Sequence, residues 1–408
     1  MTTQTKTTWR KVKLGEVLSL LIDHRGKTPK KLGGDWSREG IPAISAKNIK
    51  SGQIVNESNI RYINQKLYDK WMPEKLEKGD VLLTSEAPLG ELLYLKEKTD
   101  YCLSQRLFAL RTQPQKLNSK FLYYYFLSPI GMHQLLRRIS GTAAEGIRQA
   151  ELRQLEVSYP ENPTTQKRIA DILSAFDDKI ELNNKISRTL EQMAQAIFKE
   201  WFIDSEKLKV KSEKLGDLVK IISGHPFSSK LYTKNRKALG VVTIKNVQDG
   251  NFITSCDSFI DEKNVPTNMN QECRIHDGDI LLSLTGNVGR VCFVYGGEYL
   301  LNQRVAKLEP KETKDRAFCY FLFRQVVMQN QLINMAKGSA QPNLSPVETG
   351  EITLTIPPRK TLDKFNELAG PIYNRLVRNE VENQKLAALR DLLLPKLMSG
   401  EVLVKSEE

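Results

Sequence analysis

Histidine and paired acidic residues are the side chains of this sequence that most readily support metal binding or acid–base catalysis. The four histidines share no spacing: His24, His133, His225 and His276. Cys273 lies three residues before His276, but a zinc site needs a second pair of ligands, which the sequence does not supply. The acid pairs are typical of a solvated helix face at Asp177-Asp178 and of a turn at Asp277 and Asp279. We predict no metal site in this chain.

Motifs that bind nucleotides or transfer chemical groups are also missing. The sequence has neither a G-x-x-x-x-G-K-[ST] loop nor a G-x-G-x-x-G turn, so no phosphate-binding loop is predicted. Asn162-Pro163-Thr164 is superficially similar to the Asn-Pro-Pro-aromatic motif of adenine methyltransferases, but it lacks the second proline and the aromatic residue and favours a helix start. We interpret the chain as a binding protein without catalytic residues or a cofactor of its own. An undetected nuclease is the enzyme alternative.

The chain is an internal duplication, so its candidate binding residues occur twice. Lys47-Asn48-Ile49 recurs as Lys245-Asn246-Val247, and Gly79-Asp80-Val81 recurs as Gly278-Asp279-Ile280. Further matches follow in the same order: Ser104-Gln105-Arg106 with Asn302-Gln303-Arg304, Phe121-Leu122-Tyr123 with Phe318-Cys319-Tyr320, and Gly141-Thr142-Ala143 with Gly338-Ser339-Ala340. A repeat distance of about 200 residues indicates a duplicated domain, because solenoid units run to roughly 20 to 50 residues.

The duplication divides the chain into four segments. We predict a first lobe at 1–160, a central spacer helix at 161–205, a second lobe at 206–358, and a distal helix with the C-terminal tail at 359–408. The apolar runs 81–83 and 280–282 follow Gly-Asp and favour buried strands. The aromatic stretches that begin at Phe121 and Phe318 favour helices. Each lobe is therefore expected to be mixed α/β.

The segments after the lobes carry apolar residues at spacings of three and four over many turns, which predicts long amphipathic helices. The two stripes superimpose at an offset of 196, including the polar pairs Asn183 with Asn379 and Ser187 with Asn383. Polar residues in an apolar seam usually fix register. Gly370-Pro371 is expected to kink or restart the second helix. We predict that the helices pair as an antiparallel coiled coil, with ordinary packing against a lobe as the alternative.

Positive charge is concentrated in the lobes. Residues 1–160 contain 26 Lys and Arg against 16 Asp and Glu, residues 206–360 contain 22 against 16, and the whole chain has a formal net charge of +13. A polyanion would therefore be attracted to the lobes and not to the helices. A merely soluble basic surface is the alternative.

Cysteine usage and hydropathy indicate a cytoplasmic location. The five cysteines are an odd set without paired spacing, which favours reduced thiols. No stretch approaches the roughly 20 apolar residues of a membrane span. We expect a cytoplasmic protein without membrane contact.

Several motifs are individually weak and collectively specific. They are the lobe openings Leu14-Gly15-Glu16-Val17 and Leu215-Gly216-Asp217-Leu218, the Gly-Asp strands, Asn302-Gln303-Arg304-Val305, Gly338-Ser339-Ala340-Gln341-Pro342-Asn343-Leu344, the helix entry Pro163-x-x-Gln166-x-x-Ile169, Ile197-Phe198-Lys199-Glu200-Trp201-Phe202, and the final run Leu389-Arg390-Asp391-Leu392-Leu393-Leu394-Pro395-Lys396-Leu397-Met398-Ser399-Gly400-Glu401. With these motifs, almost the whole chain resembles the specificity subunit of type I restriction-modification systems.

This resemblance implies a function in DNA recognition. Each lobe would be a target recognition domain that reads one half of a split double-stranded DNA site, and the helices would be the spacer. Two methyltransferase subunits per chain would methylate adenine, and nuclease/translocase subunits would join for cleavage. S-adenosylmethionine, ATP and Mg are expected on those partner subunits and not on this chain. The lobes diverge where Ser85-Glu86-Ala87-Pro88 replaces Leu284-Thr285-Gly286-Asn287, as two different half-sites would require.

Candidate DNA-binding residues follow from the chemistry of readout, in which Arg and Lys contact phosphates while Asn, Gln and selected Arg contact base edges in the major groove. In the first lobe they are Arg25, Lys27, Lys47, Asn48, Gln105, Arg106 and Arg148, and in the second lobe Lys245, Asn246, Asn287, Arg290, Gln303, Arg304 and Asn343.

Each candidate also has a structural alternative. The Lys-Asn pairs are typical of a turn with solvated charge, and the Gln-Arg pairs of a buried hydrogen bond or ion pair. Asn287 and Asn343 are typical turn residues, and the remaining cations are typical surface charge.

Trp201 and Leu397 lie near the helix ends and are candidates for contact with partner subunits, with burial inside the chain as the alternative. The competing function from another class is a two-lobed protein-binding scaffold that does not recognise DNA.

Overall fold

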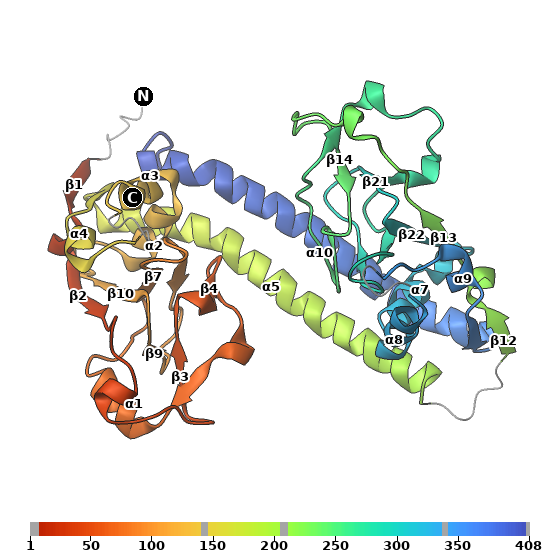
Figure 1. The fold of residues 1–408 in the computed structure, drawn as a ribbon. Helices are drawn as coiled ribbons and strands as arrows, with labels where there is room; N and C mark the ends of the chain where they lie inside the picture. Colours follow the sequence, from red (N-terminus) through yellow and green to blue (C-terminus); the bar gives the residue numbers. More distant parts are fainter. Residues whose placement is uncertain (1–7, 140–145, 205–210, 337–341, 405–408) are drawn as a thin grey trace. The chain divides into compact units, whose positions relative to one another are not determined.

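The structure is a computed structural model that describes residues 8–139, 146–204, 211–336 and 342–404 (Figure 1). These residues form two compact units, one of Met1–Asp178 with Ala387–Glu408 and the other of Lys179–Leu386. Each unit combines one lobe of the duplication with part of both long helices. The duplicated segments 141–145 and 338–341 lie outside the described residues.

The first lobe is built on two sheets. The larger has the strand order β2-β10-β7-β8 and is antiparallel, with β2 (Leu18–Asp23), β10 (Leu107–Thr112), β7 (Val81–Thr84) and β8 (Leu92–Tyr94). The smaller has the order β6-β3-β9, with β6 (Arg61–Ile63), β3 (Ile41–Ile44) and β9 (Cys102–Leu103). The remaining strands form two pairs, β4 (Ile49–Lys50) with β5 (Gln53–Ile54) and β1 (Trp9–Lys13) with β11 (Glu156–Pro160). The helices are α1 (Gln65–Trp71), α2 (Ser119–Leu127), α3 (Pro129–Leu136) and α4 (Gln149–Arg153).

The second lobe repeats this topology, with one additional strand in its smaller sheet. Its larger sheet has the order β13-β22-β19-β20, with β13 (Val219–Ser223), β22 (Val305–Pro310), β19 (Ile280–Ser283) and β20 (Val291–Phe293). Its smaller sheet has the order β17-β14-β21-β18, with β17 (Phe259–Ile260), β14 (Leu239–Val242), β21 (Tyr299–Leu301) and β18 (Arg274–Ile275). The pairs are β15 (Val247–Gln248) with β16 (Asn251–Phe252) and β12 (Lys211–Lys214) with β23 (Thr353–Ile356). The helices are α6 (Leu215–Leu218), α7 (Arg316–Phe323), α8 (Val326–Met335) and α9 (Pro346–Gly350).

The Gly-Asp motif begins a central strand in both lobes. Gly79 and Gly278 have φ angles of +93° and +84°, a left-handed conformation that favours glycine. The following aspartate closes the turn, because Oδ2 of Asp80 accepts a hydrogen bond from Glu77 N at 2.9 Å. Asp279 accepts the same bond from the backbone three residues earlier, also at 2.9 Å. The strands predicted at 81–83 and 280–282 are confirmed.

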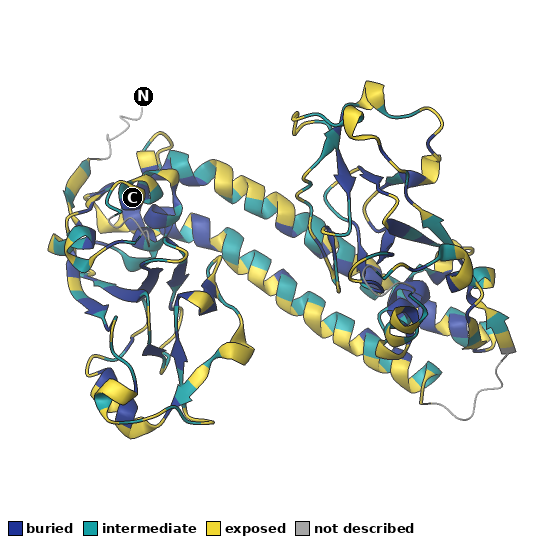
Figure 2. Ribbon diagram, viewed as in Figure 1, coloured by how far each residue is buried: buried dark blue, intermediate teal, exposed yellow. Residues whose placement is uncertain are grey.

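Each central strand separates two hydrophobic cores. Val81 and Leu83 face a core that includes Phe121 of α2, whereas Leu82 faces a core that includes Trp71 of α1. Ile280, Leu281 and Leu282 alternate in the same way between the two cores of the second lobe. This alternation follows from the two-residue side-chain period of a strand, and both central strands are buried throughout (Figure 2).

The long helices are α5 (Pro163–Phe202) and α10 (Arg359–Ser399), and they pack antiparallel. In the first unit, Asp177 pairs with Arg390. In the second unit, partner numbers fall along α10 as those of α5 rise: Asn183 with Asn383, Ser187 with Asn379, and Phe198 with Phe365. The predicted antiparallel pairing and its polar seam are confirmed.

Of the two outcomes predicted for Gly370-Pro371, a restart of the second helix is wrong, and a kink stays a prediction. Helix α10 continues through this dipeptide and through Pro395. Ala369 and Tyr373 on either side are each 2% exposed, and both pack in the core of the second unit. We attribute the continuity to this packing, which offsets the hydrogen bond that proline cannot donate.

Candidate nucleic-acid interface

Three loops meet at one end of the larger sheet in each lobe, and we call this place the strand-end edge. In the first lobe, Ser85 N donates to the carbonyl of Arg106 at 2.9 Å, and Ile147 N donates to the carbonyl of Ser85 at 3.0 Å. The second lobe repeats both bonds, from Leu284 N to Arg304 O at 3.0 Å and from Leu344 N to Leu284 O at 2.8 Å. These two peptide hydrogen bonds form the frame of the edge, and both recur in the second lobe.

A two-stranded hairpin lies beside each edge. In the first lobe, Ser51 N in the β4–β5 turn donates to Oε2 of Glu91 at 2.7 Å, directly before β8. In the second lobe, Gly250 N in the β15–β16 turn donates to the carbonyl of Val291 in β20 at 2.8 Å. The hairpins and the strand-end edges form one candidate surface per lobe.

Of the predicted cations of the first lobe, Arg25 and Lys27 act as braces, whereas Arg106 and Arg148 lie in the loops of the edge. Arg25 donates to Asp23 and to the carbonyl of Ile147 at 3.0 Å, and its guanidinium lies over the Phe108 ring at 4.3 Å. Lys27 donates to the carbonyl of Trp71 at 3.0 Å. By contrast, Gln105 and Arg148 are exposed, and Arg106 is partly exposed.

The predicted residues of the second-lobe edge come together. Gln303 and Arg304 are exposed directly before β22. Asn343 is exposed and forms an isolated bridge with Thr285. Arg290 donates to Gln248 of the hairpin at 2.5 Å and, with the Asn287 amide oriented to accept, to that side chain at 3.2 Å. Polar side chains of three loops thus line the second edge.

Asn48 and Asn246 hold the hairpin turns and are 4% and 3% exposed. Oδ1 of Asn48 accepts from Ser45 N at 3.0 Å, and its Nδ2 donates to the carbonyl of Val55 at 3.3 Å. Asn246 makes the equivalent bonds with Thr243 N at 2.9 Å and the Ile253 carbonyl at 2.7 Å. Both asparagines therefore have the structural role in a turn that was the alternative to DNA binding. The neighbouring lysines, Lys47 and Lys245, are exposed.

A basic cavity adjoins the first edge and was not predicted. It has a volume of about 470 Å³, and its lining includes Arg137, Arg138 and Arg148, with Arg138 paired to Glu151 at 3.0 Å. Arg148 follows directly after Ile147, whose backbone belongs to the edge. The Arg-Arg dipeptide was the available sequence signal, because the second lobe has Asn334-Met335 at the equivalent place.

The two predicted partner contacts lie mainly inside their own units. Leu397 is 2% exposed and belongs to the core of the first unit. Trp201 is partly buried, and its ring centroid lies 6.4 Å from those of Phe202 and Phe365. Most of the surface of both side chains is therefore buried by packing within the chain, which was the alternative to partner contact.

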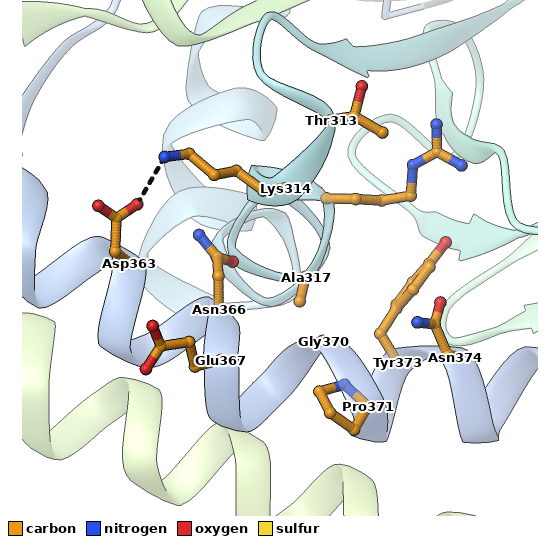
Figure 3. Close-up of a pocket in the computed structure, with 11 residues that line it drawn as sticks. Thr313, Lys314, Ala317, Asp363, Asn366, Glu367, Gly370, Pro371, Tyr373 and Asn374 are labelled. Atoms are coloured by element: carbon orange, nitrogen blue, oxygen red, sulfur yellow. Dashed lines mark ion pairs between the residues drawn. The ribbon is translucent and has the colours of Figure 1, made fainter.

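A second cavity, of about 650 Å³, lies between α7 and the first half of α10 (Figure 3). Lys314 pairs with Asp363 at 3.0 Å across it, and Tyr373 donates to the carbonyl of Gly278 at 2.8 Å. Asn366 accepts a hydrogen bond from Phe318 N at 3.1 Å and donates one to Asp315, directly before α7, at 2.8 Å. These bonds fix α7 on α10, and we assign no ligand to the cavity.

Among the described residues, no group of three or more His, Cys, Asp and Glu side chains could hold a metal ion. The helices of the described ranges also include none that is both long and apolar enough to cross a membrane.

Comparison with known families decides what this duplicated frame represents. The type I restriction modification DNA specificity domain matches twice, over residues 6–192 and 207–389. The chain belongs to this family. It is a type I specificity subunit, the component that recognises the DNA target sequence and the non-catalytic part of the enzyme. The scaffold and nuclease alternatives are thereby set aside.

Relatives match the specificity subunit along most of its length. The MjaIX specificity subunit of Methanocaldococcus jannaschii is 28% identical, covering 93% of this chain and 91% of its own. The HindI specificity subunit of Haemophilus influenzae is 23% identical, covering 87% and 94%. The crystal structure of an S subunit from M. genitalium is similar in fold, with a TM-score of 0.62, 18% identity and coverage of 100% and 99%. The tandem mixed α/β fold with long helices is thereby confirmed.

Proposed function

We propose that each lobe reads one half of a bipartite double-stranded DNA site through its strand-end edge and hairpin. The observation that supports this most directly is the repeated frame, in which the same peptide hydrogen bonds present different side chains. One lobe can cover only a few base pairs, so two lobes supply two short half-sites. The lobes, taken as 1–160 and 206–358, are the modules of this readout.

Affinity and specificity are assigned to different side chains. Exposed lysines of the hairpins, Lys47 and Lys245, and the arginines of the basic cavity contact phosphates, which position the protein without reading sequence. Bases are read by the polar side chains that the edges expose: Gln105, Arg106, Asn287, Arg290, Gln303, Arg304 and Asn343.

The paired helices act as a spacer between half-sites. A continuous helix is stiff, and α5 has 40 residues, so its length fixes a separation and leaves the intervening bases unread. Inserting matched turns into α5 and α10 should lengthen the gap between half-sites. An unchanged gap in such a variant would argue against the spacer role.

The helices also dock two methyltransferase subunits. Two exposed apolar residues of α5, Ile172 and Met193, have exposed apolar counterparts at the offset of 196 on α10, which are Leu368 and Leu389. The first unit contains Ile172 and Leu389, and the second contains Met193 and Leu368. Equivalent exposed positions offer the same surface twice, which favours two copies of one partner. Trp201 and Leu397 pack against the cores beneath these surfaces and hold the helices in place. The partners bring S-adenosylmethionine, ATP and Mg, with nuclease/translocase subunits joining for cleavage in the cytoplasm.

Docking is tested by stoichiometry. The double variants I172E/L389E and M193E/L368E should each retain one methyltransferase subunit instead of two, measured by the mass of the purified complex. L182E is the matched control, because Leu182 is 51% exposed on α5 but its counterpart on the second helix is Arg378. Loss of a subunit in the control, or of none in both double variants, would contradict this surface.

Readout is tested by mapping methylated adenines across the genome with and without this gene. One split motif should disappear with the gene. Exchanging residues 1–160 for those of a relative should then change one half of the motif only. A change in both halves would contradict modular readout.

A further inference from the structure

The first strand-end edge carries an acidic side chain where the second carries a neutral one. Glu86 lies in the β7–β8 loop, and its Oε1 is 3.1 Å from Nε of Arg106. Thr285 is its counterpart, because the isolated bridge of Glu86 with Gly146 matches that of Thr285 with Asn343. The two edges share a frame and differ in their pattern of donors and acceptors.

Arg106 has a backbone conformation that residues with a side chain rarely adopt. Its φ is +66°, whereas the equivalent Arg304 is not among the described residues with positive φ. Such conformations persist only where the surroundings enforce them, and they are concentrated at functional sites. The carbonyl of Arg106 is fixed by Ser85 N and its side chain by Glu86. The guanidinium is therefore held in place before any ligand arrives.

Both members of the pair remain accessible to a ligand. The side chain of Arg106 is 42% exposed and that of Glu86 is 29% exposed. The ion pair uses Nε, and the described residues provide no hydrogen-bond partner for Nη1 and Nη2 of Arg106. Arg25 differs, because its donors are occupied by Asp23 and by the carbonyl of Ile147.

A G·C base pair has the complementary pattern in the major groove. Guanine presents two adjacent acceptors, O6 and N7, and the paired cytosine presents its N4 amino group as a donor. An arginine beside a glutamate offers two donors next to an acceptor, so the two patterns match. An A·T pair would place the adenine amino group against one of the arginine donors.

We propose that Arg106 and Glu86 together read one G·C pair of the first half-site. Arg106 donates to O6 and N7 of the guanine, and Glu86 accepts from N4 of the cytosine while its pairing with Nε keeps the guanidinium in plane. This assignment rests on the proposed function and names the base pair that one edge requires. Thr285 gives the second edge no such acceptor charge.

The test maps methylated adenines produced by the complete complex with its methyltransferase subunits. The half-site that changes when residues 1–160 are exchanged is the first half-site. In the wild type it should contain an invariant G·C pair. E86Q and R106K should each relax the preference at that same pair by roughly 10- to 100-fold and leave the other positions unchanged. T285V is the matched control and should leave the first half-site intact.

Two results would overturn the proposal. A first half-site made only of A·T pairs excludes it from the wild-type map alone, even if neither variant folds. Unrelaxed motifs in E86Q and R106K also exclude it while leaving the split motif, and with it the proposed function, in place. A wild-type complex without any two-part motif would instead contradict the proposed function.

Discussion

The two strand-end edges share two backbone hydrogen bonds and differ in their side chains. Both are closed by two peptide hydrogen bonds at equivalent residues. The first presents an ion pair between Arg106 and Glu86 and lies beside a cavity with three arginines. The second has neutral Thr285, whose hydroxyl is buried, and exposed Asn343, and its Arg290 donates a hydrogen bond to the hairpin. Recognition has diverged in the side chains, because the frame that positions them does not depend on side-chain identity.

The largest expected contrast lies in the cores beneath the edges. Phe365 of α10 is fully buried, with its ring centroid 5.2 Å from that of Phe202 and 5.4 Å from that of Phe198, whereas its counterpart on α5 is the smaller Ile169. F365A should lower the free energy of unfolding of the second unit by about 3–5 kcal/mol, and the control I169V should lower that of the first by about 1 kcal/mol.

Hydrogen exchange resolves the two units in this experiment. Exchange should accelerate in β19 and β22 of F365A while β7 and β10 stay protected. Equal acceleration in both lobes would show that the units unfold together and would contradict the predicted difference between their cores.

A smaller contrast is expected between the two Gly-Asp turns. Asp80 pairs with Arg111 through both carboxylate oxygens, at 2.8 and 2.9 Å, and its side chain is 1% exposed. Asp279 is 3.2 Å from Lys307, which also pairs with Glu309 at 2.9 Å. D80N should cost about 2–3 kcal/mol and D279N about 1–2 kcal/mol, because D80N breaks a two-bond pair to a carboxylate that is 1% exposed, whereas D279N breaks one ion pair. In both variants the cation keeps a second carboxylate, Glu77 at 2.9 Å for Arg111 and Glu309 at 2.9 Å for Lys307. Denaturant unfolding of both variants measures the difference, and the reverse order would contradict it.

The charge contrast should appear in the salt dependence of DNA binding. R137Q/R138Q/R148Q removes the cations of the basic cavity, whose second-lobe counterparts are the neutral Asn334, Met335 and Ser345. The slope of log K against log salt should become shallower by about 0.9 for each lost phosphate contact, and by up to roughly 3 in total. K360Q/K364Q/K385Q on α10 has the same charge change and is the control. An equal loss in the control would mean that net charge and not this cavity attracts the DNA.

The smallest effect concerns one residue of the helix pair. Burial raises the pKa of Glu380, and its counterpart on α5 is the neutral Asn184. Because the pKa of Glu380 is higher in the folded state, folding favours its protonated form. The contribution of Glu380 to stability is therefore complete below the unfolded pKa of about 4.3 and is lost as pH rises through the folded pKa.

E380Q should therefore stabilise the chain near neutral pH by less than about 1 kcal/mol, because solvent screens a partly exposed group. It should have no effect below about pH 4. Thermal unfolding across this pH range measures the difference. A stabilisation that grows toward acid would have the wrong sign.

The sequence predicts the frame of this protein better than its binding surface. The Gly-Asp turns and the amphipathic stripes follow local rules of backbone conformation and periodicity, so both were predictable from spacing alone. The seam residues Asn183 and Asn379 were predictable because duplication placed them in register. The continuity of α10 through Pro371 was not, because burial of the flanking residues outweighs a local preference.

The site residues depend on distant contacts that spacing does not reveal. Asn48 has the residue type of a base reader, yet its amide is used by Ser45 and Val55. Glu86 was visible only as a departure from the second copy, and its importance arises from a partner 20 positions later. Arg25 was predicted to bind DNA because of its charge. Its packing over the Phe108 ring depends on a contact between distant residues, which only the folded structure reveals.

The peptide-only closure of the edges makes the protein permissive to change. A hydrogen bond between backbone groups forms with any residue that keeps its N–H, so a new side chain at the edge does not cost the bond that holds the loop. Substitutions there can alter which DNA is chosen while the folding free energy stays nearly constant. Descendants of one ancestral gene can thus diversify their targets by point changes, without rebuilding the lobe or its helices.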